Sequence, residues 1–263
     1  MKTYRAIPPL EKKRLLRVWH RAQEVQWSAE AVDWKAPQRI VSKVNKDRLA
    51  RILTPVLMAE RTAFHSAMAL LPFLGQNDEI ESQYFLSTWL VDEARHAELF
   101  ARMFDRLDRE PISPRRFPAA YLFQSQMLSE DPAVWFASVL VAEVMAKHVM
   151  QEFRRLDLDP VLSEISDRIL VDEARHLGFN RIYIEDRIAE IGRDDEEKAV
   201  AYGDQLTKRL ETVLQAVPVV LGSIGSELRE IEFAFDTVID CLADESRKRL
   251  ESAIRAGLST SSM

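Results

Sequence analysis

The stretch Leu90-Val-Asp-Glu-Ala-Arg-His96 decides how this chain folds, because it recurs letter for letter as Leu170-Val-Asp-Glu-Ala-Arg-His176. Each copy lies within apolar residues that return every three to four positions, which predicts a helix. The two copies start much farther apart than the roughly 20–50 residue period of solenoid proteins. The repeat therefore predicts two related helix pairs that face each other.

The helical pattern extends from this repeat over most of the chain. Glycine is scarce, with 7 residues, and no segment alternates like a strand. We predict helices over 11–34, 46–71, 78–107, 132–156, 160–191, 194–217 and 226–256, and a fraying tail from Gly257. The longest irregular connection, 110–130, has the length that a crossover between helix pairs requires. The sequence thus predicts an all-α fold, which we treat as one domain over 1–263.

Each repeat contains Glu-x-x-His, formed by Glu93 with His96 and by Glu173 with His176. Residues three positions apart share one face of a helix, so both side chains of a pair can reach one ion. A lone pair of this kind is usually part of a solvated charge run. Here both pairs lie within apolar stripes, which predicts that they face the core.

Two more glutamates, Glu60 and Glu143, are also surrounded by apolar neighbours at helical spacing. Four buried carboxylates need protons or cations, because burying an unpaired ionised carboxylate is costly. Arg95 and Arg175 point to a different helix face from the glutamates, so metal ions are the better counter-charge. One glutamate from each of two helices plus Glu-x-x-His from two others is the ligand pattern of a carboxylate-bridged di-iron or di-manganese site.

Asp92 and Asp172 directly precede Glu93 and Glu173, the glutamates of the two pairs. Metal-bound imidazoles usually donate their second N–H to a carboxylate. We expect Asp172 to hold His96 and Asp92 to hold His176. The alternative is a salt bridge within each helix, from each aspartate to the arginine three positions later.

Composition excludes several other classes of protein. An apolar fraction of 47% and a charged fraction of 30% over 263 residues are typical of a folded protein, and the net charge of −6 has the wrong sign for a general nucleic-acid binder. The single cysteine, Cys241, excludes an internal disulfide and a zinc site built on thiolate pairs. The first 16 residues lack the pattern of a signal peptide, and no apolar run has the length of a membrane span. We therefore expect a cytoplasmic protein that binds neither membrane nor nucleic acid.

With Glu60, Asp92-Glu93-x-x-His96, Glu143 and Asp172-Glu173-x-x-His176 in this order, the sequence resembles the ferritin-like di-iron carboxylate oxygenase and oxidase superfamily. That group includes ribonucleotide reductase small subunits, their ligand-binding oxidase relatives, multicomponent monooxygenases and acyl-carrier-protein desaturases. The resemblance covers about residues 48–190. It implies a ferritin-like four-helix bundle there, with accessory helices over about 11–34 and 194–256, and it implies a homodimer.

Four positions depart from particular members of this superfamily. Phe100 stands where reductase small subunits usually carry a radical tyrosine, which argues against a reductase role. Ala63 and Ser138 replace the valine and tyrosine that ligand-binding oxidases cross-link. Ile169 replaces the extra histidine ligand of arylamine N-oxygenases, so the three-histidine ligand set is excluded.

The resemblance implies an enzyme, a non-haem di-iron oxidoreductase with two Fe ions or a Mn/Fe pair and with O2 as co-substrate. It implies hydroxylation, desaturation or another oxidation of a small, apolar organic substrate, free or attached to a carrier, with electrons from an external donor. The predicted catalytic residues act through the metals and are the six ligands Glu60, Glu93, His96, Glu143, Glu173 and His176. Two alternatives stay open, namely a ferroxidase and a reductase-like small subunit without the radical tyrosine.

Overall fold

The computed structural model describes residues 10–261, and all regular elements within this range are helices. The long helices are α1 (Lys13–Glu24), α2 (Lys43–Gln76), α3 (Ile80–Leu107), α5 (Pro132–Leu156), α6 (Pro160–Asp194), α7 (Glu196–Leu214) and α10 (Phe235–Ser261). The short ones are α4 (Pro118–Met127), α8 (Val217–Gly222) and α9 (Gly225–Glu230). The predicted all-α fold class is confirmed.

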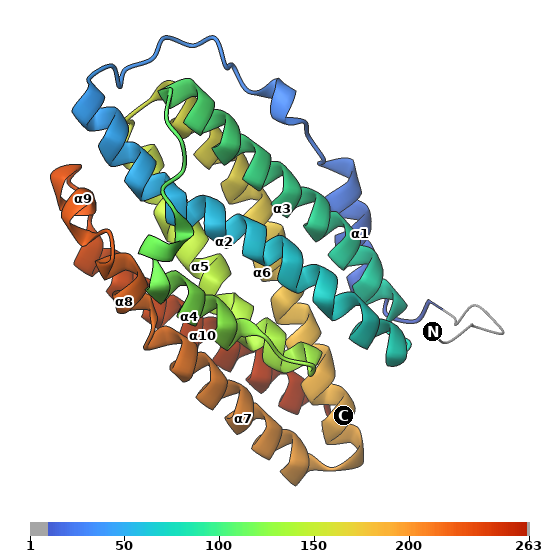
Figure 1. Cartoon of the computed structure of the whole chain (residues 1–263). Helices are drawn as coiled ribbons and strands as arrows, with labels where there is room; N and C mark the ends of the chain where they lie inside the picture. The colour runs from blue at the N-terminus through green and yellow to red at the C-terminus, as the bar shows by residue number, and fades with distance from the viewer. Residues whose placement is uncertain (1–9, 262–263) are drawn as a thin grey trace.

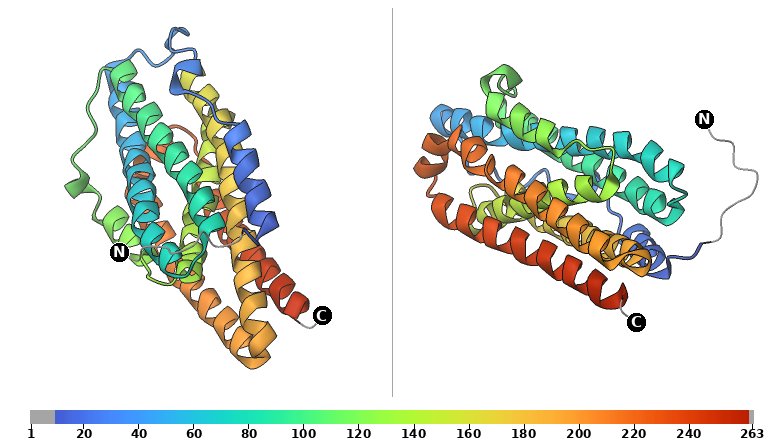
Figure 2. Two further views of the ribbon diagram at one scale, coloured as in Figure 1. Left: turned by 90° about the vertical axis from the view of Figure 1, so that its right-hand side faces the viewer. Right: turned by 90° about the horizontal axis from the view of Figure 1, so that it is seen from below.

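The core of the molecule is a bundle of α2, α3, α5 and α6 (Figure 1). Helix α2 packs along α3, and α5 packs along α6, so the two helix pairs predicted from the repeat are present. Helix α1 lies against α3 and α6, while α7 and α10 cover α5 and α6 from the other side (Figure 2). This arrangement places one face of each copy of the repeated heptapeptide inside the bundle.

Local sequence signals fix where the core helices begin. The side chain of Ser42 accepts a hydrogen bond from the backbone N–H of Asn45 at the start of α2. Asp131 and Asp159 cap α5 and α6 in the same way, and each is followed by a proline at the first helical position. These two starts agree with the predicted helices that begin at 132 and 160.

The predicted accessory helix over 11–34 is wrong in its length. Helix α1 ends at Glu24, and only a short 3₁₀ turn, Ala29–Ala31, follows before α2. The chain leaves the helix because the side chains of Gln26 and Trp27 bind aspartates inside the bundle. The energy of these buried contacts exceeds the local preference for helix.

The predicted helices at the C-terminal end and in the crossover also differ from the structure. The single helix expected over 226–256 is divided into α9 and α10, separated at Glu232, whose φ is 61°. Helix α10 continues to Ser261 rather than fraying at Gly257, because this glycine lies so close to α6 that an added Cβ would be 2.6 Å from the carbonyl oxygen of Glu185. The crossover over 110–130 contains the helix α4.

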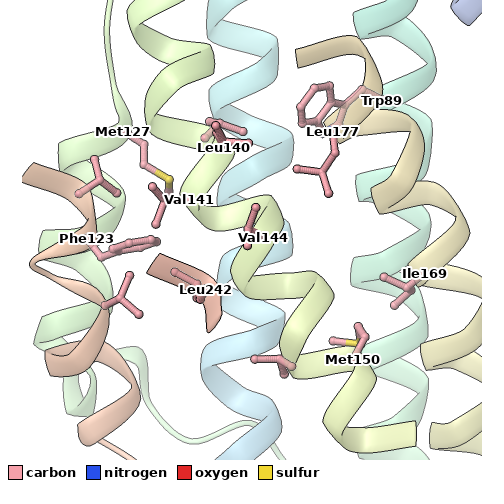
Figure 3. Packing of buried hydrophobic residues seen from close by; sticks show 14 of the residues in the cluster. Trp89, Phe123, Met127, Leu140, Val141, Val144, Met150, Ile169, Leu177 and Leu242 are labelled. Carbon is pink, nitrogen blue, oxygen red and sulfur yellow. The ribbon is translucent and has the colours of Figure 1, made fainter. Parts of the chain in front are cut away.

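Helix α5 forms the centre of the hydrophobic core. Within the described residues it is the one helix that is long and apolar enough to span a membrane by length and composition, and 78% of its most apolar window is buried in the bundle. Figure 3 shows Leu140, Val141 and Val144 of α5 among side chains from neighbouring helices. The apolar character of α5 is therefore explained by packing within the protein.

Candidate metal centre

The six predicted ligands converge at the middle of the bundle. Helix α2 supplies one glutamate and α5 another, while α3 and α6 each supply a glutamate and a histidine. All six side chains are buried: Glu60, Glu93, His96, Glu143, Glu173 and His176. The structure thus brings together every residue of the predicted set. Their role as metal ligands stays a prediction.

The first group of potential ligands consists of Glu60, Glu93 and His96, whose ligand atoms lie within 4.8 Å of one another. The Nδ1 atom of His96 is 3.4 Å from Oε2 of Glu60 and 3.9 Å from Oε2 of Glu93. Such spacing surrounds a volume that a metal ion about 2 Å from each ligand atom would fill.

The second group consists of Glu93, Glu143 and His176 and meets the same distance limit of 4.8 Å. The Nδ1 atom of His176 is 3.1 Å from Oε2 of Glu143 and 3.5 Å from Oε1 of Glu93. Glu173 lies beside both groups, with Oε1 3.9 Å from Nδ1 of His96 and Oε2 3.7 Å from Nδ1 of His176. Glu93 and Glu173 therefore each place one oxygen near each histidine, where they could contact both ions.

The two aspartates of the repeat contact the histidines across the bundle, as expected. Nε2 of His96 lies 3.1 Å from Oδ2 of Asp172, and Nε2 of His176 lies 3.2 Å from Oδ2 of Asp92. A neutral imidazole that donates its Nε2–H to an aspartate presents an unprotonated Nδ1 toward the glutamates. The aspartates thus select the tautomer that a metal needs.

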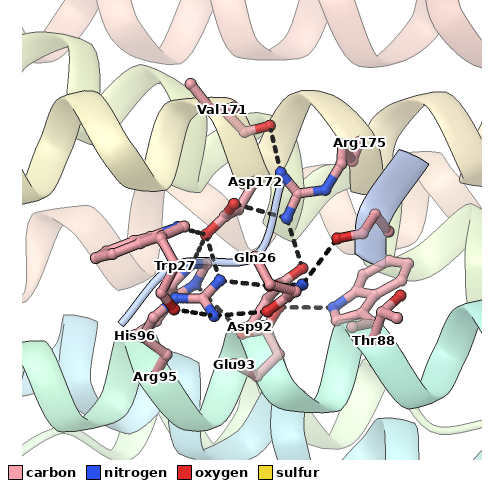
Figure 4. Close-up of polar contacts among 12 residues, drawn as sticks. Gln26, Trp27, Thr88, Asp92, Glu93, Arg95, His96, Val171, Asp172 and Arg175 are labelled. Atoms are coloured by element: carbon pink, nitrogen blue, oxygen red, sulfur yellow. Dashed lines mark hydrogen bonds and ion pairs between the residues drawn. The ribbon is translucent and has the colours of Figure 1, made fainter. Parts of the chain in front are cut away.

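The alternative salt bridges within each helix are present as well. Arg95 donates to Asp92 and, at 2.8 Å, to Asp172, while Arg175 contacts Asp172 at 2.6 Å and Asp92 at 2.9 Å. Figure 4 shows these two arginines between α3 and α6. These arginines neutralise the aspartates. Among the residues seen in the structure, no arginine contacts the four glutamates.

Sequence reasoning missed two residues from the segment after α1. Nε2 of Gln26 donates to Asp92 at 2.9 Å, and Nε1 of Trp27 donates to Asp172 at 3.0 Å (Figure 4). The guanidinium of Arg95 lies 4.5 Å from the centre of the Trp27 ring and donates to the backbone oxygen of Trp27. Nothing in the local sequence marks these two residues, because their partners are more than 60 positions away.

The pKa shifts of the two aspartates and of Glu93 and Glu173 have opposite directions. Burial, together with the negative charge of Glu60, raises the pKa of Glu93 well above its ordinary value, and burial beside Glu143 does the same for Glu173. The aspartate Asp92 is also buried, but its hydrogen bond with His176 and the charge of Arg175 lower its pKa to about 2. The aspartates are thus stable as anions, whereas no lysine or arginine within residues 10–261 forms a salt bridge with the four glutamates.

The histidines have pKa values raised well above the ordinary value. Burial alone would lower the pKa of His96, but its hydrogen bond with Asp172 and the nearby charge of Glu60 outweigh burial. His176 behaves in the same way, since Glu143 and Asp92 face it. In the absence of metal, the centre therefore holds protons in the places where ions would bind.

The donor set fits two divalent metal ions. Within residues 10–261, Nδ1 of His96 and Oε2 of Glu173 are buried without a hydrogen-bond partner, and both point at the cluster. Two divalent ions would balance the charge of the four glutamates. Carboxylates with one imidazole for each ion suit iron or manganese.

We expect the metal-free protein to lose stability as the pH rises. Glu93, Glu173 and both histidines have raised pKa values, so the folded state binds more protons than the unfolded state above pH 4.5, and that stability is lost as the protons leave. Calorimetry of the chelated protein should give a melting temperature that falls between about pH 5 and pH 8, with the decline reduced by excess Mn(II), which replaces the protons. A rising melting temperature over this window would contradict the assignment.

The four glutamates, but neither histidine, line a cavity of about 100 Å³. Trp89 and Trp135 also line it, and Nε1 of Trp89 donates to Oε1 of Glu93 at 2.6 Å while its ring stacks on His176 with centres 4.2 Å apart. Three of the small residues beside the ligands, Ala63, Ala142 and Ala146, face this cavity. Their small size therefore leaves space next to the carboxylates.

Two histidines outside the repeat lie away from the centre. His65 is exposed, and Nε2 of His148 is 3.0 Å from Oε2 of Glu245 on α10. The position four residues before Glu173 is occupied by Ile169, which is fully buried. The described centre thus offers one imidazole to each ligand group.

Comparisons with known proteins agree with this geometry. A family model described as P-aminobenzoate N-oxygenase AurF matches residues 42–203. A solved R2-like ligand-binding oxidase with an aerobically reconstituted metal cofactor after photoconversion is 18% identical, with 92% of each chain covered and a TM-score of 0.66. Another, with an aerobically reconstituted Mn/Fe cofactor, is 17% identical, with 93% of each chain covered and a TM-score of 0.62. No curated protein matches the chain.

Proposed function

The chain belongs to the P-aminobenzoate N-oxygenase AurF family, and on that premise we propose which reaction its buried carboxylates support. Membership confirms two sequence predictions, namely the ferritin-like di-iron carboxylate superfamily and a non-haem oxidoreductase. We propose that the enzyme oxidises a small organic molecule with O2, by hydroxylation, desaturation or a related two-electron oxidation. The proposed cofactor is a pair of iron ions or the Mn/Fe pair of the similar solved oxidases.

One observation carries this proposal, the cavity that opens directly onto all four glutamates. A protein that only oxidises or stores iron has no need for an apolar chamber beside the metals. The chamber is lined by tryptophans, alanines and aliphatic side chains, which exclude water and admit an organic molecule. This favours an oxygenase or oxidase over the ferroxidase alternative.

The ions, when bound, supply the redox chemistry of O2 activation. The chain would hold them through Glu60 and His96 on one side, Glu143 and His176 on the other, and Glu93 and Glu173 between the two histidines. Trp89 fixes Glu93 through its indole N–H. O2 accepts four electrons and the substrate supplies two, so we propose that an external donor supplies the other two.

The chain departs from the ligand set of arylamine N-oxygenases at one position. Ile169 stands where those enzymes carry an additional histidine, and no described histidine outside the repeat contacts the cluster. We therefore propose a centre with one histidine for each metal. Amine N-oxygenation is one of several oxidations that such a centre supports.

Replacing Glu143 by alanine tests the proposed reaction. After anaerobic loading with Fe(II), the wild-type protein is expected to consume O2 rapidly, and Glu143→Ala to consume it more than about tenfold more slowly because one ion loses its carboxylate. Glu81→Ala is the control, because Glu81 is a buried glutamate of α3 that binds the backbone N–H of Lys12, away from the centre. Equal O2 consumption by Glu143→Ala and wild type, measured with an oxygen electrode, would remove Glu143 from the centre.

A further inference from the structure

The cavity beside the glutamates extends along two helices of the bundle. It is lined along α2 from Glu60 back to Ile52 and along α5 from Glu143 to Phe153, which at 1.5 Å per residue is about 12–15 Å. Residues of α4, among them Phe123 and Met127, form a wall beside α5 (Figure 3). The volume of about 100 Å³ is of the order of an engineered cavity of about 150 Å³ that holds benzene. It suits a slender molecule with a single ring or a short chain.

The charged residues of the described lining are the four glutamates, which lie partway along it. Its remaining polar groups are the side chains of Ser66 and Gln124 and the indole N–H groups of Trp89 and Trp135; Nε1 of Trp135 is buried without a hydrogen-bond partner. Gln124 already donates from Nε2 to the backbone oxygen of Met58 at 3.2 Å. None of the lining residues in the described part of the chain is a lysine, arginine or histidine.

Two cations next to lining residues in the sequence are engaged in ion pairs. Arg51 precedes the lining residue Ile52 and forms a salt bridge with Glu227. Lys147 follows the lining residue Ala146 and binds Glu245 at 2.7 Å. A negatively charged substrate would therefore find no cationic side chain in the described lining of the cavity.

We propose that the substrate of this enzyme is an uncharged, apolar molecule, and that the cavity rejects the carboxylated aromatic amine for which the family is named. This inference rests on the proposed function, since it assigns the substrate class of the same site. A carboxylate placed in this cavity would lose its hydration without gaining a cation, and it would lie near four glutamates. Two divalent ions would balance the four glutamates and would leave no net positive charge to offset a further anion.

Two aromatic amines that differ in charge test whether the cavity rejects an anionic substrate. p-Toluidine and p-aminobenzoate carry the same aromatic amine and differ by a methyl group in place of a carboxylate. Titration calorimetry of the Fe(II)-loaded protein under anaerobic conditions measures binding without turnover. We expect p-aminobenzoate to bind at least about tenfold more weakly than p-toluidine. Equal or tighter binding of p-aminobenzoate, or binding of neither probe, would overturn the proposal.

A variant supplies the missing cation. Gln124→Arg adds a positive charge at the wall of the cavity, and it is expected to shift the ratio of the two dissociation constants toward p-aminobenzoate. Ser125→Arg is the matched control, because Ser125 is the next residue of α4, is exposed and does not line the cavity. An equal shift in both variants would show a general effect of charge and would contradict the proposal. Because no O2 is present, failure here leaves the O2 consumption test of the proposed function intact.

Discussion

Glu93→Gln is expected to abolish stable binding of both metal ions, the largest effect of any single substitution at the centre. Glu93 belongs to both groups of potential ligands, with one oxygen near each histidine. The amide of glutamine is similar in size but carries no charge, so both ions would lose an anionic ligand. Elemental analysis after anaerobic loading with Fe(II) and desalting should give two ions per chain for wild type and fewer than one for the variant.

The stability of the variant separates ligand loss from misfolding. Burial and Glu60 raise the pKa of Glu93, which means that its ionised form destabilises the metal-free protein. The metal-free variant should therefore be at least as stable as metal-free wild type at pH 8, although it no longer gains stability from added metal. Glu60→Gln is the comparison, because Glu60 belongs to one ligand group and its loss should cost one ion. Retention of two ions by Glu93→Gln would show that this residue is not a bridging ligand.

Arg95→Leu is expected to cost about 3–5 kcal/mol of folding free energy, the range for removing one partner of a buried ion pair. The guanidinium is 6% exposed, contacts both Asp92 and Asp172, and also binds Gln26 and Trp27. Leucine would leave two buried aspartates with less compensating charge and would release the segment after α1. Urea denaturation of the metal-free protein measures this loss directly.

An exposed arginine provides the control for this effect. Arg154 of α5 forms a salt bridge with Asp167 on α6, and the two side chains are 62% and 49% exposed. Because water screens such a pair, Arg154→Leu should cost less than about 1 kcal/mol. If both substitutions cost the same folding free energy, the buried network of arginines and aspartates would not give the centre the expected additional stability.

The repeated heptapeptide carried most of the information on the site. Its Glu-x-x-His spacing placed two side chains of each helix on one face, and the apolar neighbours of Glu60 and Glu143 predicted that these residues also face inward. The aspartates could be assigned across the bundle because two related halves require a reciprocal arrangement. Periodicity and local chemistry were sufficient wherever a residue acts from within a long helix.

Features that depend on contacts between distant segments could not be predicted. Gln26 and Trp27 lie in a stretch with helical character, and their exit from the helix follows from partners on α3 and α6. The extension of α10 past Gly257 depends on its close approach to α6. The two arginines of the repeat were correctly placed off the glutamate face, but their position between the aspartates appeared only in three dimensions.

The cavity could not be predicted from the sequence. Alanines beside the ligands are equally consistent with close helix packing and with open space. In the structure Ala63, Ala142 and Ala146 border the cavity, whereas Ala67 is fully buried and does not line it. Whether an alanine faces open space depends on α4 and on the segment from α8 to α9. These elements close the far wall of the cavity and lie outside the repeat.

We predict that six side chains from four helices hold two metal ions. Anaerobic titration of the chelated wild-type protein with Fe(II), followed by metal counting, tests it most directly. We predict that binding saturates at two ions per chain, with a rise in melting temperature as the sites fill. Saturation at no ion or one ion, or uptake that continues far beyond two, would contradict this prediction.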